Sequence, residues 1–127
     1  MGNIRSFKEL KVWQLSMDLA MEVFEITKGL PAAERYSLID QIRRSSRSVP
    51  SNVAEAWRKR RYPAAFVSKL NDAEGEAAET QTHVAIARRC AYLDDATAQR
   101  LDAQYEEVLA MLVAMASRPD QLTIRPE

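Results

Sequence analysis

The chain has 127 residues, with 18 basic and 18 acidic side chains and therefore no net charge. This length predicts one domain with a core of its own, and the low Gly and Pro content favours helices. A neutral chain is not a general polyanion binder, so any affinity for nucleic acid must come from locally clustered charge. The single cysteine, Cys90, excludes an internal disulfide and a cysteine zinc site.

The sequence also bears on the compartment. No stretch approaches the ~20 apolar residues that cross a bilayer, and the N-terminal MGNIRSFKEL lacks an apolar run of signal-peptide length. A lone cysteine fits a reducing environment. We therefore expect a cytoplasmic protein without a membrane partner.

The first of four helical patterns is predicted over residues 8–28, with Ser6 as N-cap and Glu9 at the capping-box spacing. Gly29 and Pro31 are typical of a helix end. Two adjoining apolar stripes cover more than the ~100° of one core contact. The stripes consist of Leu10, Trp13, Met17, Ala20 and Phe24, and of Val12, Leu15, Leu19, Val23 and Ile26.

The second helix is predicted from about residues 32–35 to the turn at residues 61–63, with a ridge that faces the core. Pro50 lies inside it and lacks the N–H that a helix interior needs. The helix therefore either kinks there or breaks and restarts, with Asn52 and Glu55 at capping-box spacing. The unbroken phase of the ridge favours the kink. The ridge consists of Ile39, Ile42, Ser46, Val49, Val53 and Trp57.

The third helix is predicted over residues 63–92 and has mostly small residues on its inward face. Gly75 in its middle costs ~1 kcal/mol relative to Ala, which predicts a close backbone contact. Asp94 or Asp95 caps the fourth helix, which ends before Pro119. The two inward faces consist of Phe66, Leu70, Ala73, Ala77, Thr80, Val84 and Ala91, and of Ala98, Leu101, Tyr105, Val108, Leu112 and Met115.

These four helices with short links predict an all-α fold. We expect an antiparallel up-down-up-down four-helix bundle whose second helix is kinked at Pro50. Residues 1–119 form its single domain, and residues 120–127 form a loose C-terminal tail.

Four sequence blocks follow one another in an order that is typical of a known family. They are Phe7-x-x-Leu10-x-Val12-Trp13-Gln14, Leu30-Pro31-x-x-Glu34-x-Tyr36, Gln41-Ile42-Arg43-Arg44 and Ser48-Val49-Pro50-Ser51-Asn52-Val53-Ala54-Glu55. The blocks, with weaker similarity as far as Tyr92-Leu93, resemble the bacterial four helix bundle proteins, also called the ribosomal RNA intervening-sequence proteins. Relatives of this family include the accessory variability determinant of diversity-generating retroelements.

The resemblance implies a four-helix bundle that assembles into a ring-shaped pentamer and has no established enzymatic activity. It also implies a basic surface, because the retroelement relative binds nucleic acid and a reverse transcriptase with such a surface. The positions that match are Arg43, Arg44 and, less strictly, Arg58. Two departures stand out: Ala56 replaces a usual Gly, and Glu76 replaces a small Ser that usually makes a tight contact.

The densest positive charge lies between residues 43 and 61, with seven basic side chains and one acid, Glu55. We predict nucleic-acid binding here, because affinity grows with the number of counterions released from phosphates. The first three of these basic residues could instead form ion pairs with Glu76 and Glu79, and we favour this alternative for them. The last four face Lys69 and have no acid nearby, so they are the better candidate for an anion site. The predicted binding residues are Arg43, Arg44, Arg47, Arg58, Lys59, Arg60 and Arg61.

Residues with catalytic or metal-binding chemistry are few. His83 lies four residues after Glu79, whereas di-metal bundles use Glu-x-x-His pairs on two helices, and there is no second histidine. Cys90 has no positioned base and is expected to be a buried structural thiol. We therefore expect no enzyme, no metal and no cofactor. The large side chains assigned to the core rather than to a ligand pocket are Trp13, Trp57, Met17, Met21, Met111 and Met115.

The sequence thus predicts a non-enzymatic, homo-oligomeric helical bundle whose basic surface binds nucleic acid, structured RNA more than DNA, without reading its sequence. The alternative is a scaffold that binds an unidentified protein. Its docking faces would be the wide apolar arc of the first helix and the acidic residues 72–79.

Overall fold

The computed structural model describes residues 4–118 and consists, in this part of the chain, of helices and connecting turns. Two short 3-10 helices, η1 and η2, each precede a long α-helix. The elements are η1 (Phe7–Glu9), α1 (Lys11–Thr27), η2 (Ala32–Glu34), α2 (Leu38–Arg58), α3 (Pro63–Arg89) and α4 (Asp95–Ser117). The predicted all-α fold is confirmed, while the tail predicted over residues 120–127 lies outside the described residues.

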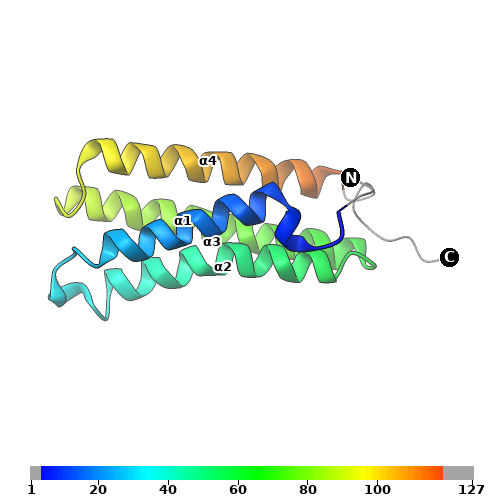
Figure 1. The fold of residues 1–127 in the computed structure, drawn as a ribbon, viewed down its shortest axis with the longest axis horizontal. Coiled ribbons are helices and arrows are strands. Elements are labelled where there is room, and N and C mark those ends of the chain that lie inside the picture. The colour runs from blue at the N-terminus through cyan, green and yellow to red at the C-terminus, as the bar shows by residue number, and fades with distance from the viewer. Residues whose placement is uncertain (1–3, 119–127) are drawn as a thin grey trace.

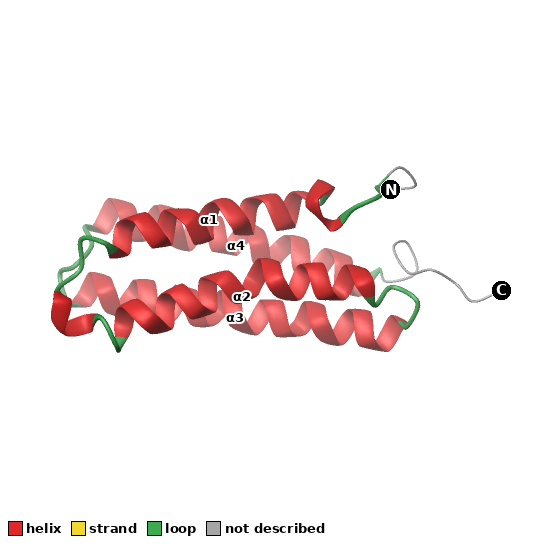
Figure 2. Cartoon of the chain, turned by 60° about the horizontal axis from the view of Figure 1, so that its bottom comes forward, coloured by secondary structure: helices red, strands yellow, loops and turns green. Residues whose placement is uncertain are grey.

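Successive long helices run in opposite directions (Figure 1). The chain turns at one end of the bundle after α1 and α3, and at the other end after α2. α1 packs against α2 and α4, and α3 packs against the same two helices. The connections between the helices lie at the two ends (Figure 2), so η1 and the α2–α3 turn share one end.

The core contains most of the predicted inward residues. Of the α2 ridge, only Ile39 is half-exposed, and Trp57 retains 6% of its exposure. On α3 the predicted face is buried from Phe66 to Val84, but the next buried residue is Ala87 rather than Ala91. Ala91 lies beyond the helix with a φ of 63° and ends α3 three residues earlier than predicted.

The starts of the first two α-helices differ from the prediction. The Ser6 and Glu9 capping box is present, but it caps η1, and α1 begins only at Lys11. η2 occupies the predicted start of the second helix, so α2 begins at Leu38. Each 3-10 turn brings the chain onto the bundle before the long helix starts.

α2 passes through Pro50 without interruption, so the predicted alternative of a break and restart is wrong. The Asn52 amide donates to the Ser48 carbonyl oxygen at 2.9 Å instead of capping a new helix. The kink at Pro50 stays a prediction.

Three further predictions are wrong. A Cβ at Gly75 would meet no atom within 4 Å, so no close backbone contact explains this glycine. Cys90 is exposed because it is the C-cap residue that follows α3 rather than part of a core face. Met21 is 54% exposed, since it lies on the outer side of α1.

Candidate nucleic-acid interface

Arg44, in the middle of α2, is neutralised by α3. Its guanidinium contacts the carboxylates of Glu76, at 2.9 Å, and Glu79. The hydrogen bond that Arg44 donates to Glu76 raises the pKa of Arg44 above its ordinary value. The ion pairing predicted for three arginines is therefore present at this one, where the antiparallel register places two acids one turn apart beside it.

Arg43 forms its hydrogen bonds with α1 instead of α3. Its Nε donates to the Thr27 hydroxyl at 2.8 Å, and its Nη2 donates to the Phe24 carbonyl oxygen at 3.3 Å. The guanidinium also lies 4.7 Å from the centre of the Phe24 ring. These partners are neutral and belong to the last turns of α1, where a cation is favoured by the helix dipole. Arg43 thus has a structural role that the sequence prediction did not include.

Arg47 is exposed, with its guanidinium 5.9 Å from the Phe24 ring. Together with Arg43 and Arg44 it lines an open groove of ≈ 560 Å³ along the outer side of α2. Asp40 is the one acid in this groove. The full lining is Arg35, Ile39, Asp40, Arg43, Arg44, Arg47, Ser48 and Ser51.

The positive charge at the end of α2 is arranged differently, and we call Arg58, Lys59, Arg60 and Arg61 the basic corner. α2 ends at Arg58, and the Lys59 N–H closes the last turn on the Glu55 and Ala56 carbonyls. Arg58, Lys59 and Arg61 are exposed, and within residues 4–118 none of them forms an ion pair. Their charge is therefore available to an anionic partner.

The Arg60 side chain differs from the three exposed cations because it is held against Trp57. Its guanidinium lies 3.4 Å from the centre of the Trp57 ring, a distance typical of a stacked cation–π pair. Burial lowers the pKa of Arg60, and the neighbouring charge of Arg58 lowers it further. Its buried Nε has no hydrogen-bond partner. An anion beside Arg60 would supply both the missing acceptor and the missing opposite charge.

The acids near the basic corner are already engaged. Lys69 Nζ lies 2.9 Å from the Glu55 carboxylate and 3.9 Å from the Asp72 carboxylate, whereas within residues 4–118 no acid forms an ion pair with the basic corner. The hydrogen bond that Lys69 donates to Glu55 raises the pKa of Lys69. Among the described residues, Glu55 thus forms its ion pair with Lys69 and not with a residue of the corner.

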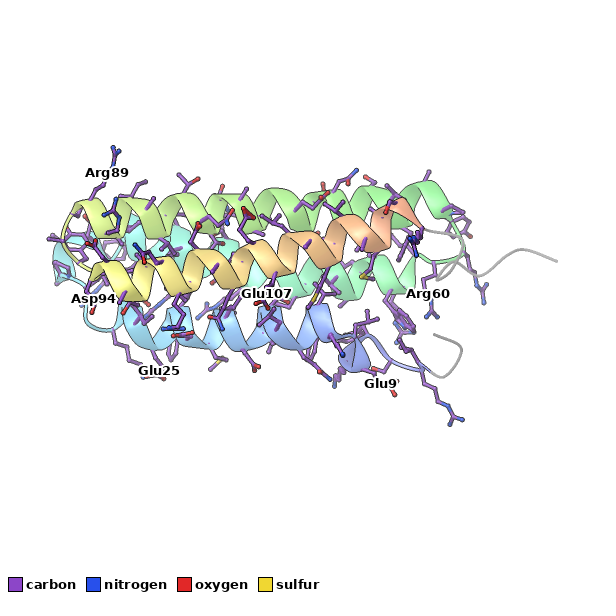
Figure 3. The ribbon with its side chains drawn as sticks, turned by 90° about the horizontal axis from the view of Figure 1, so that it is seen from above. Glu9, Glu25, Arg60, Arg89, Asp94 and Glu107 are labelled. Atoms are coloured by element: carbon purple, nitrogen blue, oxygen red, sulfur yellow. The ribbon has the colours of Figure 1, made fainter. Side chains whose placement is uncertain are left out.

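A pocket of ≈ 580 Å³, which we call the bundle-end pocket, joins the basic corner to the N-terminal segment. Arg5, Phe7 and Tyr62 were not predicted as part of the site. The only sequence signal that could have indicated them is that aromatic and basic residues occur together in these segments. Figure 3 shows Arg60 and Glu9 at this end of the bundle. The Glu9 carboxylate accepts the Arg5 and Ser6 backbone N–H groups, at 2.7 and 2.8 Å. The lining contains no acid and consists of Arg5, Ser6, Phe7, Trp57, Arg58, Arg60, Arg61 and Tyr62.

His83 Nε2 lies 3.8 Å from the Glu79 carboxylate, which Arg44 already contacts. In the part of the chain that the structure covers, no three His, Cys, Asp or Glu side chains lie close enough to hold a metal ion together. None of the described helices combines the length and the apolar character that a membrane span requires.

Comparisons with known proteins agree with this architecture. A crystal structure of a protein of unknown function from the S23 ribosomal protein family of Bacteroides thetaiotaomicron superposes with a TM-score of 0.76 at 25% sequence identity. The match covers 84% of this chain and 95% of that one. A comparison with curated proteins finds no match. A family model described as 23S rRNA-intervening sequence protein matches residues 8–114, which is most of the chain. The chain therefore belongs to the family of 23S rRNA-intervening sequence proteins.

Proposed function

We propose that this protein is a non-enzymatic, homo-oligomeric bundle that binds nucleic acid, structured RNA above all, through its positively charged end and without reading sequence. The observation that carries the proposal is the basic corner. Three exposed cations, Arg58, Lys59 and Arg61, have no ion pair among the described residues, although the chain as a whole is neutral. Uncompensated charge in a neutral protein favours a local polyanion contact.

Two further observations support RNA and the lack of sequence reading. The family description refers to intervening sequences of 23S rRNA, which favours RNA as the partner. The exposed cations of the corner lie at a helix end and in the turn that follows it, rather than along a helix face that could enter a groove and contact base edges. Contacts with phosphates position a protein on nucleic acid but carry no sequence information.

The direct test is the salt dependence of binding to a structured RNA, measured by fluorescence anisotropy. The logarithm of the affinity should fall linearly with the logarithm of the salt concentration, because binding releases counterions. The triple variant Arg58→Gln, Lys59→Gln, Arg61→Gln should bind more weakly and reduce the slope by roughly two to three, about 0.7–0.9 for each phosphate that is no longer neutralised. Binding that is absent or insensitive to salt would exclude the proposal.

A matched control removes the same charge from the other end of the bundle. The variant Lys28→Gln, Arg88→Gln, Arg89→Gln also loses three exposed cations, two of which are paired with Glu25 and Asp95. Figure 3 shows Arg89 at the end opposite to Arg60. If this control weakens RNA binding as much as the corner triple variant, the interaction depends on net charge and not on the basic corner.

Self-association is the second part of the proposal, and it rests on the family resemblance. A ring of subunits would repeat the basic corner once per subunit and increase the affinity for a long RNA through multivalency. The mass in solution, from sedimentation or light scattering, tests this part. A monomer at concentrations where RNA binds would contradict it without affecting the role of the corner.

An apolar groove favours a protein-binding scaffold as the second candidate. The groove measures ≈ 400 Å³ and lies between the start of α1 and the end of α4, with Leu10, Met111 and Met115 in its lining. Met-containing grooves are suited to docked helices. A pull-down with the products of neighbouring genes, compared between wild type and Met115→Lys, separates the two functions. Loss of the partner in this variant, with RNA binding unchanged, would favour the scaffold.

A further inference from the structure

We propose that the bundle-end pocket takes an unpaired nucleotide, with the base stacked on Tyr62 and the phosphate between Arg60 and its basic neighbours. This inference rests on the proposed function and deepens it, since it names single-stranded segments of the RNA as the part that the protein contacts. Of the residues that carry it, Arg5, Phe7 and Tyr62 lie outside the predicted basic set.

The aromatic side of the pocket fits a base. Tyr62 is 66% exposed and is the N-cap residue of α3, so it projects from a rigid helix start. Phe7 is held edge to face against Trp13, with ring centres 5.5 Å apart and an interplanar angle of 65°. Bases of any sequence stack on such rings, because every base has a π-face.

The cationic side of the pocket fits a phosphate. Trp57 holds the Arg60 guanidinium in place, and its buried Nε has no acceptor. Arg5 and Arg61 line the same pocket from two different segments. The N-terminus of α3 adds to the positive potential, since its Tyr62 cap provides no side-chain hydrogen bond to the first turn. Four arginines, Arg5, Arg58, Arg60 and Arg61, and the N-cap residue of α3 therefore line one concave space.

Aromatic and cationic groups in one pocket favour a single strand over a duplex. A duplex keeps its bases stacked inside and presents phosphates and groove edges, so Tyr62 would contribute nothing to its binding. An unpaired nucleotide offers the base and the phosphate together, which is how single-stranded nucleic acid is bound by aromatic platforms beside basic grooves. The volume of ≈ 580 Å³ lies within the range of small-molecule sites.

The test compares a single-stranded RNA oligonucleotide with a duplex of the same length, by fluorescence anisotropy on the full chain. Tyr62→Ala should weaken binding of the single strand roughly tenfold and leave duplex binding unchanged, since the stacking of one base is removed. Tyr62→Phe should restore wild-type affinity because the ring remains. A strand with abasic sites should bind wild type about as weakly as the intact strand binds Tyr62→Ala.

The control is Tyr36→Ala, which removes an aromatic ring that is 87% exposed in the turn before α2, away from the pocket. This variant should change neither the affinity for the single strand nor the affinity for the duplex. Thermal melting checks that each variant is folded, as expected for exposed positions. If Tyr62→Ala weakens the binding of single strand and duplex equally, or changes the binding of neither, the proposal of an unpaired-nucleotide site is wrong, while the proposed function stands. If wild type binds neither ligand, the proposed function fails as well.

Discussion

The two positively charged stretches of α2 differ in what the neighbouring helices place beside them. In the middle of the helix, Arg44 contacts Glu76 and Glu79 on α3, and Arg43 is bonded to α1. At the basic corner, the exposed cations have no acid within ion-pair distance in the described structure, and Arg60 is stacked on Trp57. Similar runs of arginine thus serve packing in one place and remain available in the other.

The difference shows that the register of the adjacent helix, rather than the density of arginine, decides which charge is free. α3 runs antiparallel to α2, so its acids lie level with the middle of α2 and its first turns lie level with the corner (Figure 1). The first charged residue of α3, Lys69, then holds Glu55, which is the acid closest to the corner in the sequence. Screening by solvent also makes the exposed Arg44 pairs weak contributors to stability.

The largest expected effect comes from Trp57, which joins the basic corner to the core. Trp57→Ala should lower the free energy of unfolding by about 3–5 kcal/mol, because it leaves a cavity at a position that is 6% exposed. It also removes the platform under Arg60. Urea denaturation followed by circular dichroism measures the change.

Trp57→Phe is the control, since it keeps an aromatic face for Arg60 and most of the buried volume. It should cost clearly less stability than Trp57→Ala and retain more RNA affinity. A Trp57→Ala variant as stable as wild type would show that the corner is not anchored in the core.

The next effect concerns Arg43, the arginine that holds α1. Arg43→Met keeps an aliphatic stem but loses the hydrogen bonds to Thr27 and Phe24, one of them to a hydroxyl that is almost fully buried. We expect a loss of about 1–2 kcal/mol in the free energy of unfolding. Arg47→Met, at an exposed position with no such hydrogen bond, should change it by less than about 0.5 kcal/mol. Equal effects of both substitutions would contradict the structural role of Arg43.

The sequence predicted the helices well because apolar spacing depends only on local geometry, as the buried face from Phe66 to Val84 shows. It also predicted the partners of Arg44, since counting outward from a turn gives the register of two antiparallel helices. It missed the role of Arg43, because a hydroxyl and a backbone carbonyl carry no charge signal. The bundle-end pocket was missed for another reason: Arg5 and Tyr62 line one pocket only because the N-terminal segment with η1 lies at that end of the bundle.

Freeing Arg44 should make the middle of α2 behave more like the corner. Glu76→Gln with Glu79→Gln removes both carboxylates and leaves the guanidinium without an ion pair. RNA affinity at low salt should rise a few-fold, and the salt slope should steepen by roughly 0.7–0.9 if Arg44 then neutralises one phosphate. The slope is measured by anisotropy titrations at several salt concentrations.

Its control makes the same change of charge elsewhere. Glu106→Gln with Glu107→Gln removes two exposed carboxylates of α4. This pair should leave the slope unchanged. Equal steepening in both double variants would mean that net charge governs binding and that the pairing of Arg44 is irrelevant.

The smallest effect lies at the end of the bundle opposite to the corner, where the charge is hydrogen-bonded. The Glu34 carboxylate accepts from the Ser37 hydroxyl at 2.6 Å and from the Tyr92 hydroxyl at 2.9 Å. These bonds, that from Ser37 first, lower the pKa of Glu34 below its ordinary 4.5. The folded state therefore binds the proton less tightly than the unfolded state, so this contribution to stability is present above pH 4.5 and is lost as the pH falls through the lowered pKa.

Glu34→Gln removes that titration, so the variant should lose slightly less stability than wild type between about pH 5 and pH 3. Thermal melting at closely spaced pH values measures the difference. RNA binding at neutral pH should be unaffected, because η2, which contains Glu34, and the α2–α3 turn with the basic corner lie at opposite ends of the bundle (Figure 1). An acid-induced loss of stability that is identical in both proteins would show that these hydrogen bonds do not distinguish the folded from the unfolded state.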